Sequence, residues 1–124
     1  MCDDCYRKES IGERRIRQYL ERHCIPYIPE AWFHDCRDIK PLPFDFYLNE
    51  NNTIIEFDGK QHFYDGKKFF HNTYDYEITK RHDKIKNKYC EDNSINLIRI
   101  PYWKLNEIDI ILDTKLNYSH EDIV

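Results

Sequence analysis

Three acidic residues occupy alternating positions in two neighbouring segments of the chain. Asp45 lies within Phe44–Leu48, and Glu56 and Asp58 lie within Thr53–Asp58. A strand rises roughly 3.3 Å per residue, so Glu56 and Asp58 would lie about 6.6 Å apart on one side of a strand. If the two segments pair, the three carboxylates converge, and a cation or shared protons must relieve their repulsion. Mg²⁺, with Mn²⁺ as a substitute, suits such a cluster because it binds a few carboxylates and keeps water ligands for a phosphate substrate.

The alternation of apolar and polar residues predicts that the two segments form a β-hairpin. In the first segment the apolar residues fall on the side opposite Asp45; they are Phe44, Phe46 and Leu48. In the second segment Ile55 and Phe57 share one side, whereas Ile54 shares the other side with the two acids. Asn49–Asn52 forms the turn, because Asn tolerates a positive φ angle. An alternative stays open, since acids on a strand commonly line its solvated face.

The residues that follow the second segment weaken this alternative. Lys60, Gln61 and His62 add a cation, an amide and an imidazole directly after Gly59. An imidazole titrates near neutral pH and transfers protons in either direction. The segment therefore combines acids, a base and a cation within a few residues.

The arrangement of these motifs resembles the PD-(D/E)XK nuclease superfamily. The residues that carry the resemblance are S-I-G-E upstream, F-D-F-Y-L, I-I-E-F-D-G-K-Q-H-F, and I-N-L-I-R-I-P-Y downstream. Within the superfamily they are most similar to small domains like the very-short-patch repair endonucleases and related homing endonucleases. The resemblance covers roughly Ser10 to Tyr102 and implies a restriction-endonuclease-like α/β fold and a Mg²⁺-dependent DNA endonuclease.

The resemblance also implies a role for each acidic residue. Asp45, Glu56 and Asp58 would hold the metal ion, and His62 would act as general base or acid. Glu13 matches an acid that points into the active site from the first helix. Capping of that helix by Glu13 and Ser10 is a complete structural explanation for the same residue.

The chain departs from the E-x-K pattern of the superfamily, because Asp58 stands where the lysine would be. Lys60 could reach the site from the turn, or His62 could replace the lysine, and we favour His62. Lys60 and Gln61 would then position the phosphate. The missing lysine also supports a second hypothesis, a nucleic-acid-binding module that keeps the fold without turnover.

The remaining elements are predicted from capping, periodicity and prolines. A helix spans residues 10–23, an irregular stretch with short extended pieces spans 25–40, a second helix runs from 74 or 76 to 92, a strand spans 95–100, and a last helix spans 105–116. Strand–helix–strand crossovers are right-handed and parallel, so residues 95–100 should pair in parallel with Thr53–Asp58. We therefore expect one α/β domain in the order α-β-β-α-β-α, with a mixed sheet flanked by helices, a core of residues 10–116, and tails at 1–9 and 117–124.

The helix before residue 92 carries a dense basic cluster. Its members are Lys80, Arg81, Lys84, Lys86 and Lys88. Such a face would neutralise DNA phosphates, although solvated helix faces are often rich in lysine as well. His82 falls on the apolar stripe of the same helix, which favours a half-buried histidine with a hydrogen-bond partner over a metal ligand.

Composition sets outer bounds on function. The 124 residues carry a net charge of −4, which does not by itself indicate nucleic-acid binding. Five cysteines without framework spacing favour reduced thiols, although Cys2 and Cys5 could form half of a zinc site. No signal peptide or membrane segment is expected, so we predict an intracellular protein. The nuclease resemblance implies DNA as the partner, and a domain this small could need a homodimer or a fused DNA-binding domain for specificity. A purely structural or protein-interaction domain is a third hypothesis.

Overall fold

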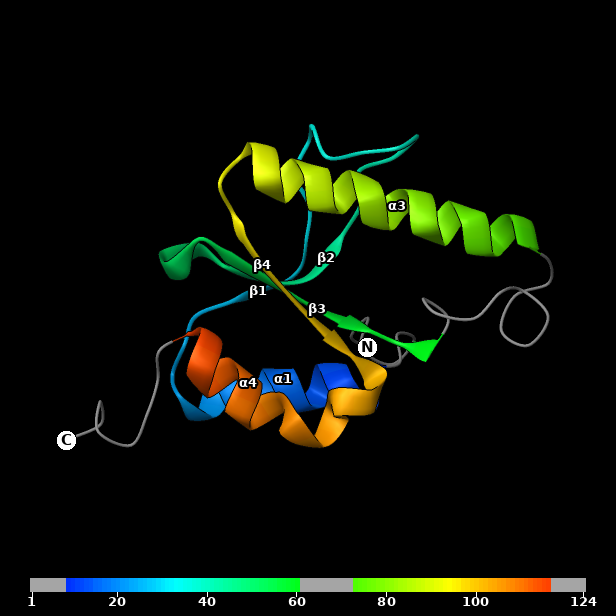
Figure 1. Cartoon of the computed structure of the whole chain (residues 1–124). Coiled ribbons are helices and arrows are strands. Elements are labelled where there is room, and N and C mark those ends of the chain that lie inside the picture. The colour runs from blue at the N-terminus through cyan, green and yellow to red at the C-terminus, as the bar shows by residue number, and fades with distance from the viewer. Residues whose placement is uncertain (1–8, 61–72, 117–124) are drawn as a thin grey trace, which may run out of the picture.

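The computed structural model describes residues 9–60 and 73–116. The elements in chain order are α1 (Ile11–Arg22), β1 (Ile28–Ala31), β2 (Phe44–Leu48), η2 (Asn49–Asn51), β3 (Thr53–Asp58), α3 (Thr73–Asp92), β4 (Asn96–Pro101), η4 (Tyr102–Glu107) and α4 (Ile108–Lys115), as labelled in Figure 1. Gln61, His62, Cys2 and Cys5 lie outside the described residues, and the predictions for them stay predictions.

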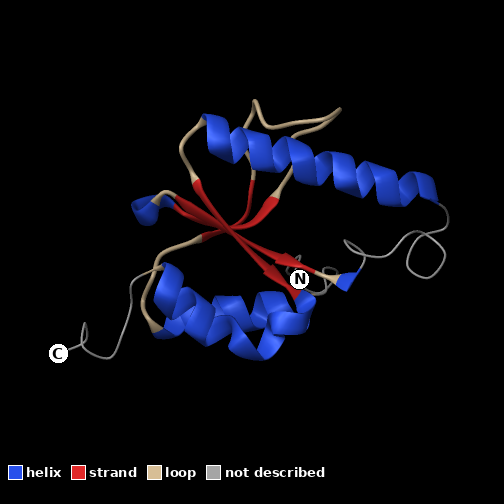
Figure 2. Ribbon diagram, in the orientation of Figure 1, coloured by secondary structure: helices blue, strands red, loops and turns tan. Residues whose placement is uncertain are grey.

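The four strands form one mixed sheet in the order β1-β2-β3-β4. β2 pairs antiparallel with β1 and with β3, whereas β4 pairs parallel with β3 from Thr53↔Asn96 to Asp58↔Pro101. Helix α3 crosses one face of the sheet, and α1 and α4 cover the other (Figure 2). The predicted α/β class, the flanking helices and the parallel crossover are thus confirmed.

Helix α1 begins with the capping box that its sequence predicts. The Ser10 hydroxyl accepts a hydrogen bond from the Glu13 amide at 3.1 Å, and Glu13 Oε1 accepts one from the Ser10 amide at 2.9 Å. Gly12 lies in the first turn of α1, directly before Glu13, and a Cβ atom at this position would overlap the Phe57 ring. Glycine therefore lets the first turn of α1 lie directly against β3, which fixes where Glu13 sits.

The core consists of two clusters on opposite faces of the sheet. The cluster against α1 and α4 includes Ile16, Tyr19, Leu20, Phe46, Leu48, Ile55, Ile100, Ile108 and Leu112. The cluster on the α3 side includes Cys36, Phe44, Ile54 and Cys90, with Ile85 and Tyr89 packed against it. These assignments confirm that Ile55 and Phe57 share one side of β3 and that Ile54 lies on the other.

The prediction that Phe44 shares a side with Phe46 and Leu48 is wrong. All three are buried, but Phe44 belongs to the α3-side cluster. The β2–β3 ladder runs from Leu48↔Thr53 to Phe46↔Ile55. Beyond that point the amides of Asp45 and Phe57 donate to side-chain carboxylates instead of backbone carbonyls. The backbone pairing that would keep the side chains in regular alternation is therefore missing at the start of β2.

Three boundaries differ from the sequence prediction. Within the irregular stretch predicted over residues 25–40, one strand forms, β1, and it spans Ile28–Ala31. The turn is a 3₁₀ segment, and Asn52 takes the expected left-handed conformation with φ of 50°. The last α-helix starts at Ile108 instead of residue 105, because η4 precedes it and Lys104 departs from helical geometry.

In the described part of the chain, none of the helices combines the length and apolar character needed to cross a membrane.

Candidate functional site

The candidate site is built where β2 and β3 stop pairing through their backbones. The Asp45 amide donates to Glu56 Oε2 at 2.6 Å, and the Phe57 amide donates to Asp45 Oδ2 at 2.8 Å. Each carboxylate thus accepts from an amide of the opposite strand. The predicted hairpin does bring Asp45 and Glu56 together, and the exchange of side-chain bonds holds both carboxylates between the two strands.

Glu13 joins this pair from α1. Its carboxyl group is hydrogen-bonded to the Asp45 side chain while it also accepts from the Ser10 amide. Glu13 therefore caps α1 and faces Asp45 at the same time, so the two explanations for this residue are compatible. Helix α1, strand β2 and strand β3 each contribute one acid.

Burial and, after it, the neighbouring acids change the protonation of Asp45. Burial raises the pKa of its carboxyl group to about 8, and the charges of Glu56 and Glu13 act in the same direction. The hydrogen bond from the Phe57 amide opposes the increase. A carboxyl group with a pKa this high holds a proton at neutral pH unless a cation compensates for its charge.

Glu56 has a cationic partner from a distant part of the chain. Its side chain is buried, and Lys86 Nζ on α3 lies 2.9 Å from Oε1. The Lys86 side chain is only 14% exposed and its ammonium group lies over the Phe44 ring, 5.2 Å from the ring centre. A close, buried ammonium makes a charge-assisted hydrogen bond to Glu56 and fixes the orientation of its side chain.

Asp58 is bound elsewhere. Arg99 Nη1 on β4 donates to Asp58 Oδ1 at 2.9 Å, and the same guanidinium donates from Nε to Asn87 Oδ1 on α3 at 2.9 Å. Asp83 lies 3.8 Å from Arg99 Nη1. These contacts tie Asp58 to β4 and α3 and leave it outside the Glu13–Asp45–Glu56 group.

The predicted convergence of Asp45, Glu56 and Asp58 on one ion therefore differs from the observed arrangement. Over residues 9–60 and 73–116, no three carboxyl, imidazole or thiol groups are placed so that they could hold a metal ion. Lys86 and Arg99 relieve part of the repulsion that led us to expect a metal ion, because they pair with Glu56 and Asp58 but not with Asp45. The metal-ligand roles of the three acids stay predictions.

The predicted nucleic-acid contacts are spread over two regions. Lys60 follows the end of β3, with Nζ 5.8 Å from the centre of the Tyr102 ring. Lys80, Arg81 and Lys84 lie on α3, where Lys80 Nζ is 5.6 Å from the centre of the Tyr76 ring. Arg81 Nη2 lies 2.7 Å from Asp38 Oδ2. Lys84 is exposed and has no carboxylate partner among the described residues.

His82 has the environment that its position on the apolar stripe predicts. Its side chain is 32% exposed and Nε2 lies 3.0 Å from Asp38 Oδ2. It is thus a half-buried histidine with a hydrogen-bond partner, and it takes no part in the carboxylate group.

Two side chains that contact the candidate site residues were missed by the sequence analysis. Lys86 was counted with the basic surface of α3, and Arg99 was assigned no partner. A signal for Lys86 was present, because it lies four residues after His82 and three before Tyr89, at the edge of the apolar stripe. No comparable signal predicts Arg99, since its contact with Asp58 depends on the parallel register of β3 and β4.

Comparisons with known proteins yield one uncharacterised relative. The chain is 29% identical over 113 residues to uncharacterized protein 033L of Invertebrate iridescent virus 3. The match covers 87% of this chain and 58% of the viral protein, so the chain spans less than two thirds of the relative's length. No protein-family model matches the chain, and no solved structure matches it.

Proposed function

We propose that this protein is a divalent-metal-dependent nuclease that hydrolyses phosphodiester bonds in DNA. The observation that supports the proposal best is the carboxyl group of Asp45, held between two strands with Glu56 and Glu13 beside it. Glu56 is buried, and Asp45 and Glu13 are half-buried beside it. Bringing acids together away from water is unfavourable, so this arrangement calls for a functional explanation.

The donor chemistry of this group fits a divalent cation such as Mg²⁺ or Mn²⁺. Asp45 and Glu56 would hold the ion, with Glu13 in reach through Asp45, because hard cations prefer carboxylate oxygens. The surroundings of Asp45 are the observation that tests the fit, since burial and the charges of Glu56 and Glu13 disfavour its ionised form, and a bound cation would favour that form. When bound, the ion supplies a water of lowered pKa and positive charge next to the scissile phosphate.

Lys86 gives the proposal a cation that the E-x-K pattern lacks. Asp58 occupies the lysine position of that pattern, but Lys86 brings an ammonium group to Glu56 from α3. In this role Lys86 orients the Glu56 side chain through their hydrogen bond, and it adds positive charge near the position of a bound phosphate. Asp58, held by Arg99, would fix β3 against β4 and would not hold the ion.

The predicted DNA contacts keep their places in the proposal. Lys60 lies just beyond β3, close to the carboxylates in sequence, and Lys80, Arg81 and Lys84 would contact phosphates further away. His62 and Gln61 stay candidates for proton transfer and phosphate positioning, as the sequence predicts.

A second function is favoured by one specific observation. Both oxygens of Glu56 already accept hydrogen bonds, one from Lys86 and one from the Asp45 amide. A protein in which these bonds persist would bind nucleic acid on the same fold without cleaving it.

The test compares wild-type protein with Asp45→Asn in a plasmid-nicking assay with Mg²⁺ or Mn²⁺. Asparagine keeps an oxygen for the Phe57 amide, so the fold should survive while cleavage falls on the order of 100-fold or more. Asp92→Asn is the matched control, because Asp92 is exposed and pairs with Lys88 on the far part of α3. Metal-dependent nicking by wild type and control, but not by Asp45→Asn, would support the nuclease.

The other outcomes separate the alternatives. Retention of DNA in a gel-shift assay without nicking by any of the three proteins would favour the binding module. Equal nicking by wild type and Asp45→Asn would overturn the assigned site, and absence of both binding and nicking at low salt would overturn both functions.

A further inference from the structure

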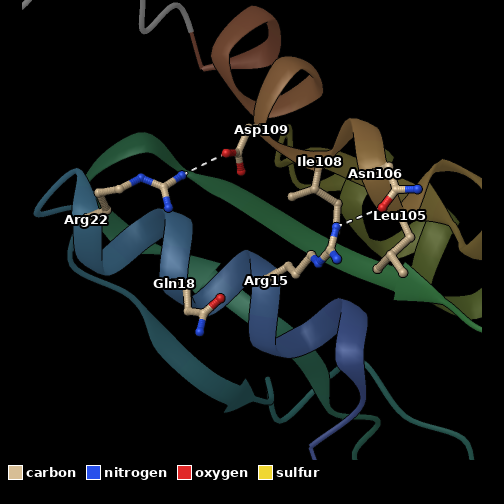
Figure 3. A pocket seen from close by; sticks show the side chains of 7 residues that line it. All are labelled: Arg15, Gln18, Arg22, Leu105, Asn106, Ile108 and Asp109. Carbon is tan, nitrogen blue, oxygen red and sulfur yellow. Dashed lines mark hydrogen bonds and ion pairs between the residues drawn. The ribbon is translucent and has the colours of Figure 1, made fainter.

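A polar groove lies between α1 and the η4–α4 segment (Figure 3). Its volume is about 260 Å³, which is large enough to admit a small ligand. The lining residues are Arg15, Gln18, Arg22, Leu105, Asn106, Ile108 and Asp109. Arg15 follows Glu13 by two residues, roughly 200° around the helix, so the groove opens on the opposite flank of α1 from the carboxylate site.

The groove carries a positive charge that the described residues do not neutralise. Arg22 Nη2 pairs with Asp109 Oδ2 at 2.9 Å, which accounts for the single carboxylate of the lining. Arg15 contacts the neutral oxygen of Asn106, with Nη1 at 2.9 Å from Oδ1, and has no carboxylate partner in the described part of the chain. One full positive charge is therefore presented to the groove.

The guanidinium of Arg15 is also oriented. The bond to Asn106 joins α1 to η4 across 91 residues and holds the planar fork at the edge of the groove, as Figure 3 shows. One of its five N–H groups is used in this bond, so the remaining donors can reach a ligand. Since Asn106 accepts through its oxygen, its amide nitrogen is left as a further donor. A fixed fork of donors with a net positive charge matches the oxygens of a phosphate group.

The competing explanation is that these contacts only join two helices. Arg22 and Asp109 fit that explanation, but both side chains are more than half exposed and such pairs contribute at most about 1 kcal/mol to stability. The packing of Tyr19 and Leu20 against Ile108 and Leu112 already joins the helices through the core. An arginine that pairs with a neutral amide at a groove is therefore better explained by a ligand.

We propose that this groove binds a phosphate group, with Arg15 as its principal contact and Asn106 as a second donor. The phosphate could belong to a nucleic-acid backbone or to a free phosphate or nucleotide, and both sources present the same oxygens. The proposal does not depend on cleavage at Asp45, because the groove lies on the other flank of α1.

The test measures binding of two probes, inorganic phosphate and a short DNA duplex, to the full chain. Arg15→Gln should weaken binding of the effective probe at least tenfold. Asn106→Asp should do the same by placing a carboxylate next to the unchanged Arg15. Arg14→Gln is the matched control, because Arg14 neighbours Arg15 on α1, is exposed and faces Glu9, outside the groove. Thermal unfolding verifies that each variant is folded.

The two probes distinguish the sources. If a DNA phosphate occupies the groove, Arg15→Gln should also reduce the slope of log K against log salt by about 0.9, the value for one lost phosphate contact. If free phosphate is the ligand, its titration should shift the backbone amide signals of residues 105–109 in wild type and not in Arg15→Gln. The proposal is overturned if Arg15→Gln binds both probes as tightly as Arg14→Gln, or if wild type binds neither probe. If wild-type protein binds phosphate through Arg15 but does not nick plasmid DNA, the result would count against the nuclease and not against the phosphate site.

Discussion

The two faces of the sheet bury different kinds of side chain. On the face covered by α1 and α4, the cluster is hydrophobic and fills the space with aliphatic and aromatic side chains. On the face covered by α3, two charged pairs lie among the apolar residues, Glu56 with Lys86 and Asp58 with Arg99. Neighbouring residues of β3 show the contrast most directly, because Ile55 and Glu56 are both buried but on opposite sides.

The difference suggests which face carries function. A buried ion pair must recover the cost of removing both charges from water, and hydrophobic replacements are often equally or more stable. Packing alone would therefore favour apolar residues on the α3 side as well. The pair of Glu56 with Lys86, next to Asp45 on β2, is consistent with a site kept for its chemistry, and Glu13 reaches Asp45 from α1 on the other face.

Lys86→Met should show the largest effect on stability. Methionine keeps much of the aliphatic stem but leaves Glu56 buried without its cation, which typically costs about 3–5 kcal/mol. The free energy of unfolding from urea titration measures this loss. Lys88→Met is the matched control, because Lys88 lies on the same helix in an exposed pair with Asp92 and should change stability by less than about 1 kcal/mol.

The double variant Lys86→Met/Glu56→Gln sharpens this result. Removing the charge of Glu56 should restore part of the lost stability, since the penalty of Lys86→Met comes from an unpaired carboxylate. Equal losses in the single and double variants would show that Lys86 acts through packing over Phe44 and not through its charge.

How far the sequence predicted the structure depends on the range of the interactions involved. The capping box of α1, the alternation in β3 and the left-handed Asn52 depend on neighbouring residues, and all three predictions are confirmed. The parallel direction of β4 beside β3 followed from the handedness of crossovers. Local patterns and general rules of topology were sufficient for these features.

The partners of the acidic residues could not be predicted in the same way. Lys86 is 30 residues from Glu56, and Arg99 is 41 residues from Asp58, so these pairs form only when α3 and β4 pack against β3. The position of Phe44 depends on the same site, because the regular ladder ends where Asp45 and Glu56 replace backbone acceptors. The sequence predicted that Asp45 and Glu56 would lie close together. It did not predict which cations pair with the acids, because those contacts depend on the tertiary structure.

The pH dependence of stability should separate Asp45 from the paired acids. Its pKa is raised from 3.8 to about 8 in the folded protein, so folding favours the protonated form. Stability from this group is fully present below about 3.8 and is lost as the pH rises toward about 8. Wild type should lose about 1–3 kcal/mol relative to Asp45→Asn between about pH 5 and pH 7.

Urea unfolding of both proteins at several pH values measures this difference. Above about pH 8 the two curves should run parallel, because Asp45 is then ionised in both states. Mg²⁺ added at high pH should recover stability in wild type and not in Asp45→Asn if the ion binds there. Curves that stay parallel from pH 5 upward would mean that burial and the charges of Glu56 and Glu13 do not raise the pKa of Asp45.

The smallest effects should come from paired Ile→Val substitutions on the two sides of β3. Ile55 lies in the cluster against α1 and α4, Ile54 lies in the cluster against α3, and both are fully buried. Removing one methylene typically costs about 0.5–1.5 kcal/mol, so Ile55→Val and Ile54→Val should have similar effects. Similar losses would mean that apolar packing is equally close on both faces, and that the contrast between them lies in the charged pairs. A much smaller loss for Ile54→Val would instead point to looser packing under α3, and the charged pairs would then carry more of the stability of that face than apolar contact does.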